Sequence, residues 1–397
     1  MNTFVIHTDC RHYKTDRPCT PHKQTGAVCG SCTVYDPIRT RILIVKLDAI
    51  GDVLRTTSLL KPLKAKYPNS EVTWITKSAS VDLLRNNPYV DEVVAKGADA
   101  IELLLTKLFD VVINPDTSET STRLATLAKG KQKFGFVFSD NGVIRPLNAT
   151  GENWYRMGLN DGLKKQNDRT YQSILLEICE LPLVDHPIIW HVSDDERQFA
   201  ARFAARHHID FARQAVIGLN TGAGGRWKWK KWTLGGYGEL IRIINTELPD
   251  AKILLYGGPE EVERNQELRA LAPNKVVDTG TENSLREFGA LVSLCDVMVT
   301  GDTLGLHVAT AQGKRIVALF GPTSAPEIDL YGRGDKIIAQ GLDCLGCYLS
   351  DCDVRPACME RIHAPEVFAR VRLHAGEVMQ TKTVDEVGWK GWTPSIW

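Results

Sequence analysis

The sequence has no excess charge of either sign, no long hydrophobic run and no low-complexity tract. Lysine plus arginine and aspartate plus glutamate both number 48 in 397 residues, so the formal net charge is zero. A nucleic-acid-binding protein would be strongly basic, and we therefore expect no nucleic-acid partner. No apolar run approaches the roughly 18 residues of a membrane-spanning helix, and the first residues lack a signal-peptide pattern. These absences favour a cytoplasmic globular protein, whose length suits two domains.

Cysteine, by contrast, is abundant and clustered. Eight of the ten cysteines fall into two groups: Cys10, Cys19, Cys29 and Cys32 near the start, and Cys344, Cys347, Cys352 and Cys358 near the end. Each group contains a C-x2-C pair, and four thiolates suit a structural zinc or iron site. Redox-labile thiols or disulfides are the alternative, and both groups could instead supply ligands to one composite site. Cys179 and Cys295 lie in apolar contexts typical of core packing.

From Arg41 onward, short apolar runs alternate with helical stretches, which is the pattern of a parallel α/β sheet. The predicted strands are Arg41–Lys46, Glu71–Ile75, Phe109–Asn114, Ala215–Asn220, Lys252–Tyr256, Asp296–Thr300 and Arg315–Phe320. The predicted helices are Asp52–Lys66, Tyr171–Cys179, Gly238–Glu247 and Leu304–Gln312.

This pattern predicts two Rossmann-like domains with cysteine-rich additions. We place a cysteine-rich segment at 1–40, the two domains at 41–190 and 191–340, a cysteine-rich finger at 341–363 and a tail at 364–397. We expect the tail to form a helix that crosses back to the first domain and docks through Trp389, Trp392 and Trp397.

The stretch from Gly301 to Thr323 predicts a ligand site. A strand, a turn, a short helix and a second strand follow one another, and both turns lie at strand carboxyl ends, where open α/β sheets bind ligands. The helix begins after Asp302 and Thr303, and a helix N-terminus suits phosphate. His307 lies one turn further on the same face. Each residue alone could be a helix cap or a packed side chain; together they favour a site.

Four motifs resemble glycosyltransferase family 9, whose best-known members are the lipopolysaccharide heptosyltransferases. Arg41–Lys46 followed by Ala49-Ile50-Gly51-Asp52-Val53 resembles the opening of that family. The other motifs follow in the family's order: Asn220–Ala223 with Lys230-Lys231-Trp232, then Gly257–Glu260, then Asp302 to Thr323. The resemblance implies a GT-B fold, in which two Rossmann-like domains face a cleft. The first would bind mainly the acceptor and the second the sugar donor.

The family also implies roles for single residues. Transfer would be inverting, with Asp52 as the base; a helix cap or first-turn acid is the alternative for Asp52. The implied donor ligands are Thr221, Gly222, Lys230, Glu260, Asp302, Thr303 and His307, with Lys230 on the diphosphate. Lys46, Arg55 and Arg123 are candidates for the acceptor. The basic aromatic stretch Arg226–Trp232 would otherwise predict a nucleic-acid loop, which no second basic stripe supports.

The expected donor is ADP-heptose, and the expected acceptor is a lipopolysaccharide-type saccharide or a protein. No Asp-x-Asp pair ends a strand, so no catalytic metal is expected. Leu304 stands where the heptosyltransferases often have glycine, with Gly305 displaced by one position, which leaves other nucleotide sugars open. Peripheral association with the inner face of the cytoplasmic membrane and a homo-oligomer are both compatible with the chain.

Two alternatives compete with a transferase. The cysteine groups lie outside the core heptosyltransferase pattern, although some protein-modifying members of the wider family carry a four-cysteine iron finger. Together with Leu304, they would also suit a metal-bearing binding or redox protein on a degenerate transferase scaffold. A nucleotide-sugar epimerase is a weaker option, because that class shares the two-domain architecture.

Overall fold

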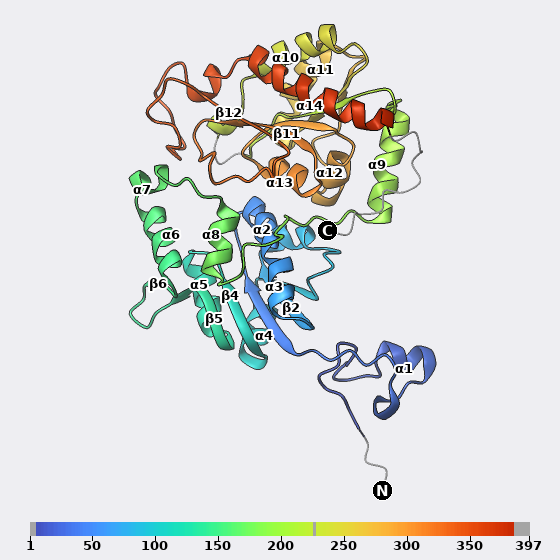
Figure 1. The fold of residues 1–397 in the computed structure, drawn as a ribbon, viewed down its shortest axis with the longest axis vertical. Coiled ribbons are helices and arrows are strands. Elements are labelled where there is room, and N and C mark those ends of the chain that lie inside the picture. The colour runs from blue at the N-terminus through green and yellow to red at the C-terminus, as the bar shows by residue number, and fades with distance from the viewer. Residues whose placement is uncertain (1–4, 225–227, 385–397) are drawn as a thin grey trace. The chain divides into compact units, whose positions relative to one another are not determined.

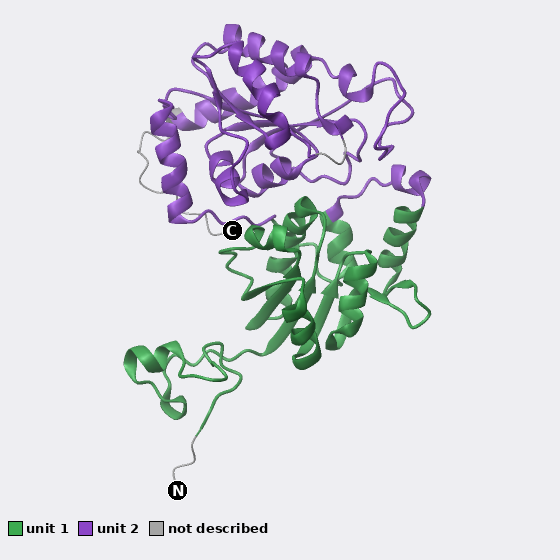
Figure 2. Cartoon of the chain, turned by 180° about the vertical axis from the view of Figure 1, so that it is seen from behind, with its two compact units in different colours: residues 1–159, 172–187 green, residues 160–171, 188–397 purple. Residues whose placement is uncertain are grey.

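The computed structural model describes residues 5–224 and 228–384, which form two compact units. Figure 2 colours them separately: the first comprises residues 1–159 and 172–187, and the second 160–171 and 188–397. The chain enters the second unit just before Trp190, because that ring packs there. Its indole lies 4.4 Å from the Arg286 guanidinium and against Gly289, where a Cβ would meet the ring.

The first unit contains a six-stranded sheet in the order β3-β2-β1-β4-β5-β6. All neighbours are parallel except β6, which is antiparallel to β5. The strands are β1 (Thr40–Val45), β2 (Ser70–Thr76), β3 (Glu92–Ala95), β4 (Leu108–Asn114), β5 (Lys129–Phe138) and β6 (Ile144–Pro146). Helices α4 (Ala98–Thr106), α5 (Glu119–Leu127), α6 (Ala149–Leu159) and α8 (Tyr171–Ile178) accompany them (Figure 1). Burial on both faces explains why β1 and β4 are continuous apolar runs.

The helix predicted at Asp52–Lys66 is interrupted. It divides into α2 (Ile50–Thr56), a 3-10 turn at Thr57–Leu59 and α3 (Leu60–Lys66). Two hydroxyls bond back to helix carbonyls at the break: Thr56 Oγ1 donates to Asp52 O at 2.7 Å and Thr57 Oγ1 to Leu54 O at 2.6 Å. Pro62 then has no N–H with which to continue the ladder.

The second unit contains a fully parallel sheet in the order β12-β11-β10-β7-β8-β9. Its strands are β7 (Val216–Asn220), β8 (Lys252–Tyr256), β9 (Val276–Asp278), β10 (Val297–Gly301), β11 (Arg315–Phe320) and β12 (Gly334–Ile338). Its longer helices are α9 (Asp194–Arg206), α10 (Leu234–Glu247), α11 (Val262–Ala270), α12 (Leu285–Val292), α13 (Leu304–Ala311) and α14 (Ala364–Val384). Within the described ranges, no helix is long and apolar enough to cross a membrane.

The predicted strand–helix–strand unit is present as β10, α13 and β11, and Gly313 follows α13 with a φ of +68°. The predicted terminal helix is also present as α14. Val367, Phe368 and Val371 of α14 join the core of the second unit, and His374 Nε2 lies 2.8 Å from Asp335 Oδ2. Over this range the helix therefore packs on the second unit. The expected docking of Trp389, Trp392 and Trp397 lies outside the described residues.

Both sheets have the same chain order. The chain begins in the middle, at β1 or β7, adds two strands on one side, and then crosses to the other side at β4 or β10. In open α/β sheets, ligands bind at the carboxyl ends of the strands beside this reversal. A functional site is therefore expected at the residues that end β1 and β4 in the first sheet and β7 and β10 in the second.

Candidate functional site

Asn220 bridges the point of reversal in the second sheet. It ends β7, and its Nδ2 donates to Thr300 Oγ1 on β10 at 2.9 Å and to Thr303 Oγ1 at 2.8 Å. Its carbonyl accepts from the buried Tyr237 hydroxyl at 2.6 Å. Thr303 consequently makes no capping bond to α13, although it is the N-cap residue. Asn220 belongs to the motif Asn220–Ala223 but had no predicted role of its own, and its place at the end of a strand was the available signal.

Packing explains why glycine stands at residue 305 and leucine at residue 304. A Cβ at residue 305 would lie 2.7 Å from Asn220 Nδ2 and 3.4 Å from Thr303 Oγ1. An atom therefore approaches the backbone closely at residue 305, and this atom is the Asn220 amide nitrogen and not a ligand atom.

The change Gly305→Ala should lower the free energy of unfolding by about 1–3 kcal/mol, because the new methyl group overpacks a filled site. Urea denaturation would measure it. Gly235→Ala is the matched control: it also lies near the start of a helix, α10, but a Cβ there meets nothing within 4 Å. Equal effects of the two changes would contradict the packing argument.

Lys230, Asp302 and His307 come together at the carboxyl end of β10. Lys230 Nζ lies 3.2 Å from Asp302 Oδ2 and 3.2 Å from the Asp302 carbonyl oxygen, and His307 Nε2 lies 3.9 Å from Asp302 Oδ1. All three side chains are less than 20% exposed. Gly301 permits this arrangement, because a Cβ there would lie 2.8 Å from the Lys230 carbonyl oxygen. The structure thus groups one cation, one carboxylate and one imidazole.

Thr221 and Gly222 face the interior of the second unit. The Thr221 hydroxyl donates to Asn265 Oδ1 at 2.7 Å, and its residue is 1% exposed. A Cβ on Gly222 would lie 2.7 Å from the Glu261 Oε2 atom. The Thr221 hydroxyl therefore holds the loop after β7 in place, as does the Thr221 N–H, which donates to Tyr256 O at 2.9 Å.

Glu260 and Glu261 have different environments, which the sequence could not separate. Glu261 is 2% exposed, accepts from Gly258 N at 2.8 Å and pairs with Lys231. The Glu260 side chain is 57% exposed and lies 3.2 Å from Lys231 Nζ. Burial opposes the charge of Lys231, but the hydrogen bonds to Glu261 and Glu260 outweigh it and raise the pKa of Lys231. Glu261 is thus a structural carboxylate, and Glu260 is the one that can meet a ligand.

In the first unit, Asp52 lies in the first turn of α2, directly after β1. Its Oδ1 accepts from Arg55 Nη2 at 2.7 Å, and its Oδ2 accepts from Ala49 N at 3.3 Å. The Asp52 side chain is 34% exposed, whereas that of Arg55 is 9% exposed. Arg55 therefore supports the carboxylate from within, and Asp52 keeps an accessible face.

The other two acceptor candidates differ from each other. Lys46 follows β1 and its Nζ lies 3.7 Å from Asp116 Oδ2, which follows β4, so this pair spans the reversal of the first sheet. Arg123 lies on α5 with a side chain that is 61% exposed; it pairs with Glu119 on the same helix and stacks 4.7 Å from the Phe138 ring. Lys46 thus lies at the ligand edge of the sheet, and Arg123 has the contacts of a surface helix residue.

Each cysteine group lines a cavity of its own. Cys344, Cys347, Cys352 and Cys358 surround a space of about 20 Å³ together with Trp229, Gly321 and Pro322. Burial raises the pKa of the Cys358 thiol to about 11. Cys10, Cys19, Cys29 and Cys32 line a larger cavity of about 560 Å³. None of the ten cysteines forms a disulfide. Among the described residues, no group of three or more His, Cys, Asp or Glu side chains is arranged to hold a metal ion.

Two Rossmann-like units, each with charged side chains at its strand reversal, define an α/β protein of the GT-B-like class. The family model described as glycosyltransferase family 9 (heptosyltransferase) matches residues 100–357, and the chain belongs to this family. It is a glycosyltransferase.

Three similar proteins illustrate the relationship. The lipopolysaccharide core heptosyltransferase OpsX of Haemophilus influenzae is 23% identical over 309 residues, which cover 75% of this chain and 84% of OpsX. The structure of Escherichia coli ADP-heptose lps heptosyltransferase II superposes with a TM-score of 0.62 at 19% identity, covering 85% and 99% of the two chains. TibC of enterotoxigenic E. coli, a dodecameric iron-containing heptosyltransferase solved with ADP-D-beta-D-heptose, has a TM-score of 0.53 at 10% identity, covering 86% and 77%. These likenesses give no support to a non-enzymatic binding or redox protein.

Proposed function

We propose that this enzyme transfers heptose, with inversion, from ADP-heptose to a lipopolysaccharide-type saccharide. The observation that carries the proposal is the group of Lys230, Asp302 and His307 at the carboxyl end of β10, in a chain of a heptosyltransferase family. The relatives' names support the donor and the acceptor, since one is a lipopolysaccharide core heptosyltransferase and another an ADP-heptose enzyme. A protein acceptor is the alternative, and an assay with both kinds of acceptor would distinguish it from a saccharide acceptor.

In this mechanism Asp52 is the base. The acceptor hydroxyl gives its proton to the Asp52 carboxylate while its oxygen bonds to the anomeric carbon. The bond between that carbon and the diphosphate oxygen breaks at the same time, and the electron pair leaves with ADP. Arg55 orients the base through its 2.7 Å contact, and a correctly held general base contributes about 10²–10⁴-fold.

Lys230 stabilises the leaving diphosphate, because a fixed cation is most effective where negative charge develops. Asp302 holds the Lys230 ammonium by two contacts of 3.2 Å, and His307 lies on the other carboxylate oxygen. Thr303 is held by Asn220 at the start of α13, where backbone N–H groups suit a phosphate oxygen. Thr221, Gly222 and Glu260 complete the donor site, with Glu260 directed to the nucleoside. Lys46 would meet the acceptor, and Arg55 would act on it through Asp52.

A panel of nucleotide sugars in a thermal unfolding assay tests the donor. ADP-heptose at 100 times its Kd should stabilise the protein by about 2.7 kcal/mol, since only the native state binds it. ADP alone serves as the control for the nucleotide part. Stabilisation by a uridine diphosphate sugar without any by ADP-heptose would contradict the proposed donor.

We further propose that both cysteine groups bind structural zinc or iron. The cavity of about 20 Å³ among Cys344, Cys347, Cys352 and Cys358 is little larger than one water-sized sphere, about 10–15 Å³, and so suits a single ion. Four thiolates are a regular donor set for either metal, and a bound ion would cross-link the finger. Two bonds already join that finger to the loop after β11: Gly346 N to Gly321 O at 3.0 Å and Tyr348 N to Pro322 O at 2.9 Å.

Elemental analysis of the purified protein tests the metal proposal. We expect at least one equivalent of zinc plus iron, because such sites hold metal tightly, and less than about 0.3 equivalents would contradict it.

Ten cysteines without a disulfide suit a reducing compartment, and we place the enzyme in the cytoplasm, where its sugar acceptor would be reached at the inner face of the membrane.

A further inference from the structure

The N-terminal cavity offers more metal ligands than its cysteines. Besides Cys10, Cys19, Cys29 and Cys32, the side chains of His7, His12 and His22 line the same cavity. Zinc in structural sites takes four ligands, commonly three thiolates and one imidazole. Seven candidates therefore compete for four positions, and the local geometry has to select among them.

Local spacing groups the candidate ligands into pairs, two of which lie close together in the chain. Cys19 is the N-cap of α1 (Thr20–Thr25), and His22 follows in the first turn of that helix. Cys29 begins a 3-10 turn at Cys29–Ser31, and Cys32 closes it, with Cys32 N bonded to Cys29 O at 3.4 Å. Both pairs have two intervening residues, which lets one turn present two ligands to one ion. His7 and Cys10 have the same spacing, with Cys10 N bonded to His7 O at 3.2 Å, but they lie on a separate segment, where Cys10 forms an isolated bridge with Pro37.

One nitrogen of the His22 ring is fixed by the backbone. Its Nδ1 lies 2.9 Å from the Ala27 carbonyl oxygen. A carbonyl oxygen only accepts, so Nδ1 carries the proton and Nε2 keeps the lone pair. Metal-binding histidines almost always have their second nitrogen fixed in this way. The His7 ring, in contrast, is stacked 4.3 Å from Tyr35.

We propose that Cys19, His22, Cys29 and Cys32 form a Cys3His zinc site and that Cys10 is not a ligand. This inference rests on the proposal that the N-terminal group binds metal, and it changes the ligand set expected from the cysteines alone. The mixed nitrogen and sulfur set favours zinc, whereas the all-thiolate finger at Cys344–Cys358 also suits iron.

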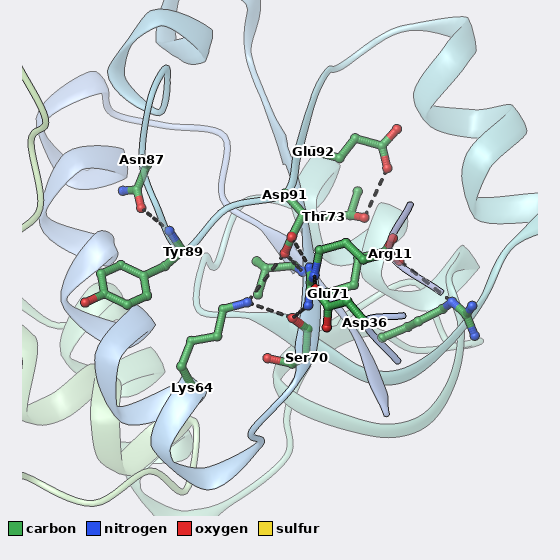
Figure 3. Close-up of polar contacts among 12 residues, drawn as sticks. Arg11, Asp36, Lys64, Ser70, Glu71, Thr73, Asn87, Tyr89, Asp91 and Glu92 are labelled. Atoms are coloured by element: carbon green, nitrogen blue, oxygen red, sulfur yellow. Dashed lines mark hydrogen bonds and ion pairs between the residues drawn. The ribbon is translucent and has the colours of Figure 1, made fainter. Parts of the chain in front are cut away.

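The position of this zinc site argues for a structural role. Arg11 fixes the N-terminal segment to the first sheet, as Figure 3 shows: its Nε lies 3.0 Å from Asp36 Oδ2, its Nη2 donates to Ser70 O at 3.0 Å, and its Nη1 pairs with Asp91. Ser70 begins β2 and Asp91 precedes β3, so the attachment is at the amino ends of the strands. Asp52 lies beyond the carboxyl end of β1, at the opposite edge. Zinc here would fold the segment and leave the chemistry untouched.

Zinc content of the full-length protein and three variants tests the ligand set. His22→Ala should lose about one equivalent of zinc, whereas Cys10→Ser should keep the wild-type content. His22→Cys should restore zinc with four thiolates. Cobalt substitution should show this as stronger sulfur-to-metal charge transfer than in the wild type. Retention of zinc by His22→Ala together with loss in Cys10→Ser would overturn the proposal in favour of four cysteines.

Two further outcomes would also overturn it. Equal metal content in the wild type and the variant Cys19→Ser, Cys32→Ser would show that no N-terminal site exists. Iron with acid-labile sulfide, lost in that variant, would show a cluster in place of zinc. The stabilisation by ADP-heptose is measured on the same samples and should not change in His22→Ala. This stabilisation reports whether the two units are folded. If ADP-heptose stabilised no sample, the proposed donor would be wrong, and the zinc proposal would be unaffected.

Discussion

Replacing Asp52 by asparagine should lower kcat for sugar transfer by about 10²–10⁴-fold, the usual contribution of a general base. Asparagine has nearly the same shape but cannot accept the proton of the acceptor hydroxyl. Asp52 accepts from both Arg55 and Ala49 N in the native protein, and the single carbonyl oxygen of asparagine can keep one of these two bonds. The stabilisation by ADP-heptose should stay close to that of the wild type, since the proposed donor ligands lie in the other unit.

Asp82→Asn is the matched control for this change. Asp82 also pairs with an arginine three residues later, Arg85, at 2.5 Å, and its side chain is 40% exposed. Loss of such a local ion pair costs little by itself. If Asp52 is only a first-turn acid, Asp52→Asn should behave like the control. Ordinary turnover in Asp52→Asn would show that the base is another residue.

Removing the amine of Lys230 should have the second largest effect. We expect Lys230→Ala to lower kcat by about 10²–10³-fold, the loss seen when one fixed donor to a developing negative charge is removed. Lys230 Nζ is held by two contacts to Asp302, and its backbone rests on Gly301, so its position does not depend on the ligand. ADP-heptose binding should weaken less than kcat falls, because charge on the diphosphate grows as the bond breaks.

Lys228→Ala is the control, since Lys228 and Lys230 belong to one 3-10 turn, Lys228–Lys230, and carry the same charge. Its side chain is 67% exposed and lies 3.8 Å from Asp351. Steady-state kinetics on both variants would distinguish the loss of the fixed Lys230 ammonium from the loss of one positive charge anywhere in the turn. An equal fall in kcat in the two variants would contradict a specific role of Lys230.

The regular parts of the fold could be predicted because they follow from local patterns. The runs at β1, β4, β10 and β11 are buried on both faces and are therefore continuously apolar, which a reader of the sequence can see. Gly313 after α13 marked a helix end correctly. The interruption between α2 and α3 was missed, because it depends on which hydroxyls bond back to the helix, and the periodicity of apolar residues is unchanged by that choice.

The candidate site shows a similar division. The motifs identified Lys230, Asp302, Thr303 and His307, and the structure brings them together. Asn220 joins β7 to β10 and α13, and Lys231 joins Glu260 and Glu261. Both belong to the quoted motifs, but the sequence assigned neither of them a role. Their partners lie some 30 to 80 residues away in the sequence, and hydrophobic periodicity does not say which distant residues face each other.

By itself, the sequence determined the class of protein: two parallel α/β units, two cysteine groups and the four motifs of a glycosyltransferase family. These are local in the chain, and local spacing is enough to specify them. Only the tertiary structure decided that Glu261 turns inward while Glu260 stays accessible, that Gly305 makes room for Asn220, and that His22 Nδ1 meets the Ala27 carbonyl oxygen. Each of these depends on which atoms meet after strand order is set, and strand order is a property of the folded chain.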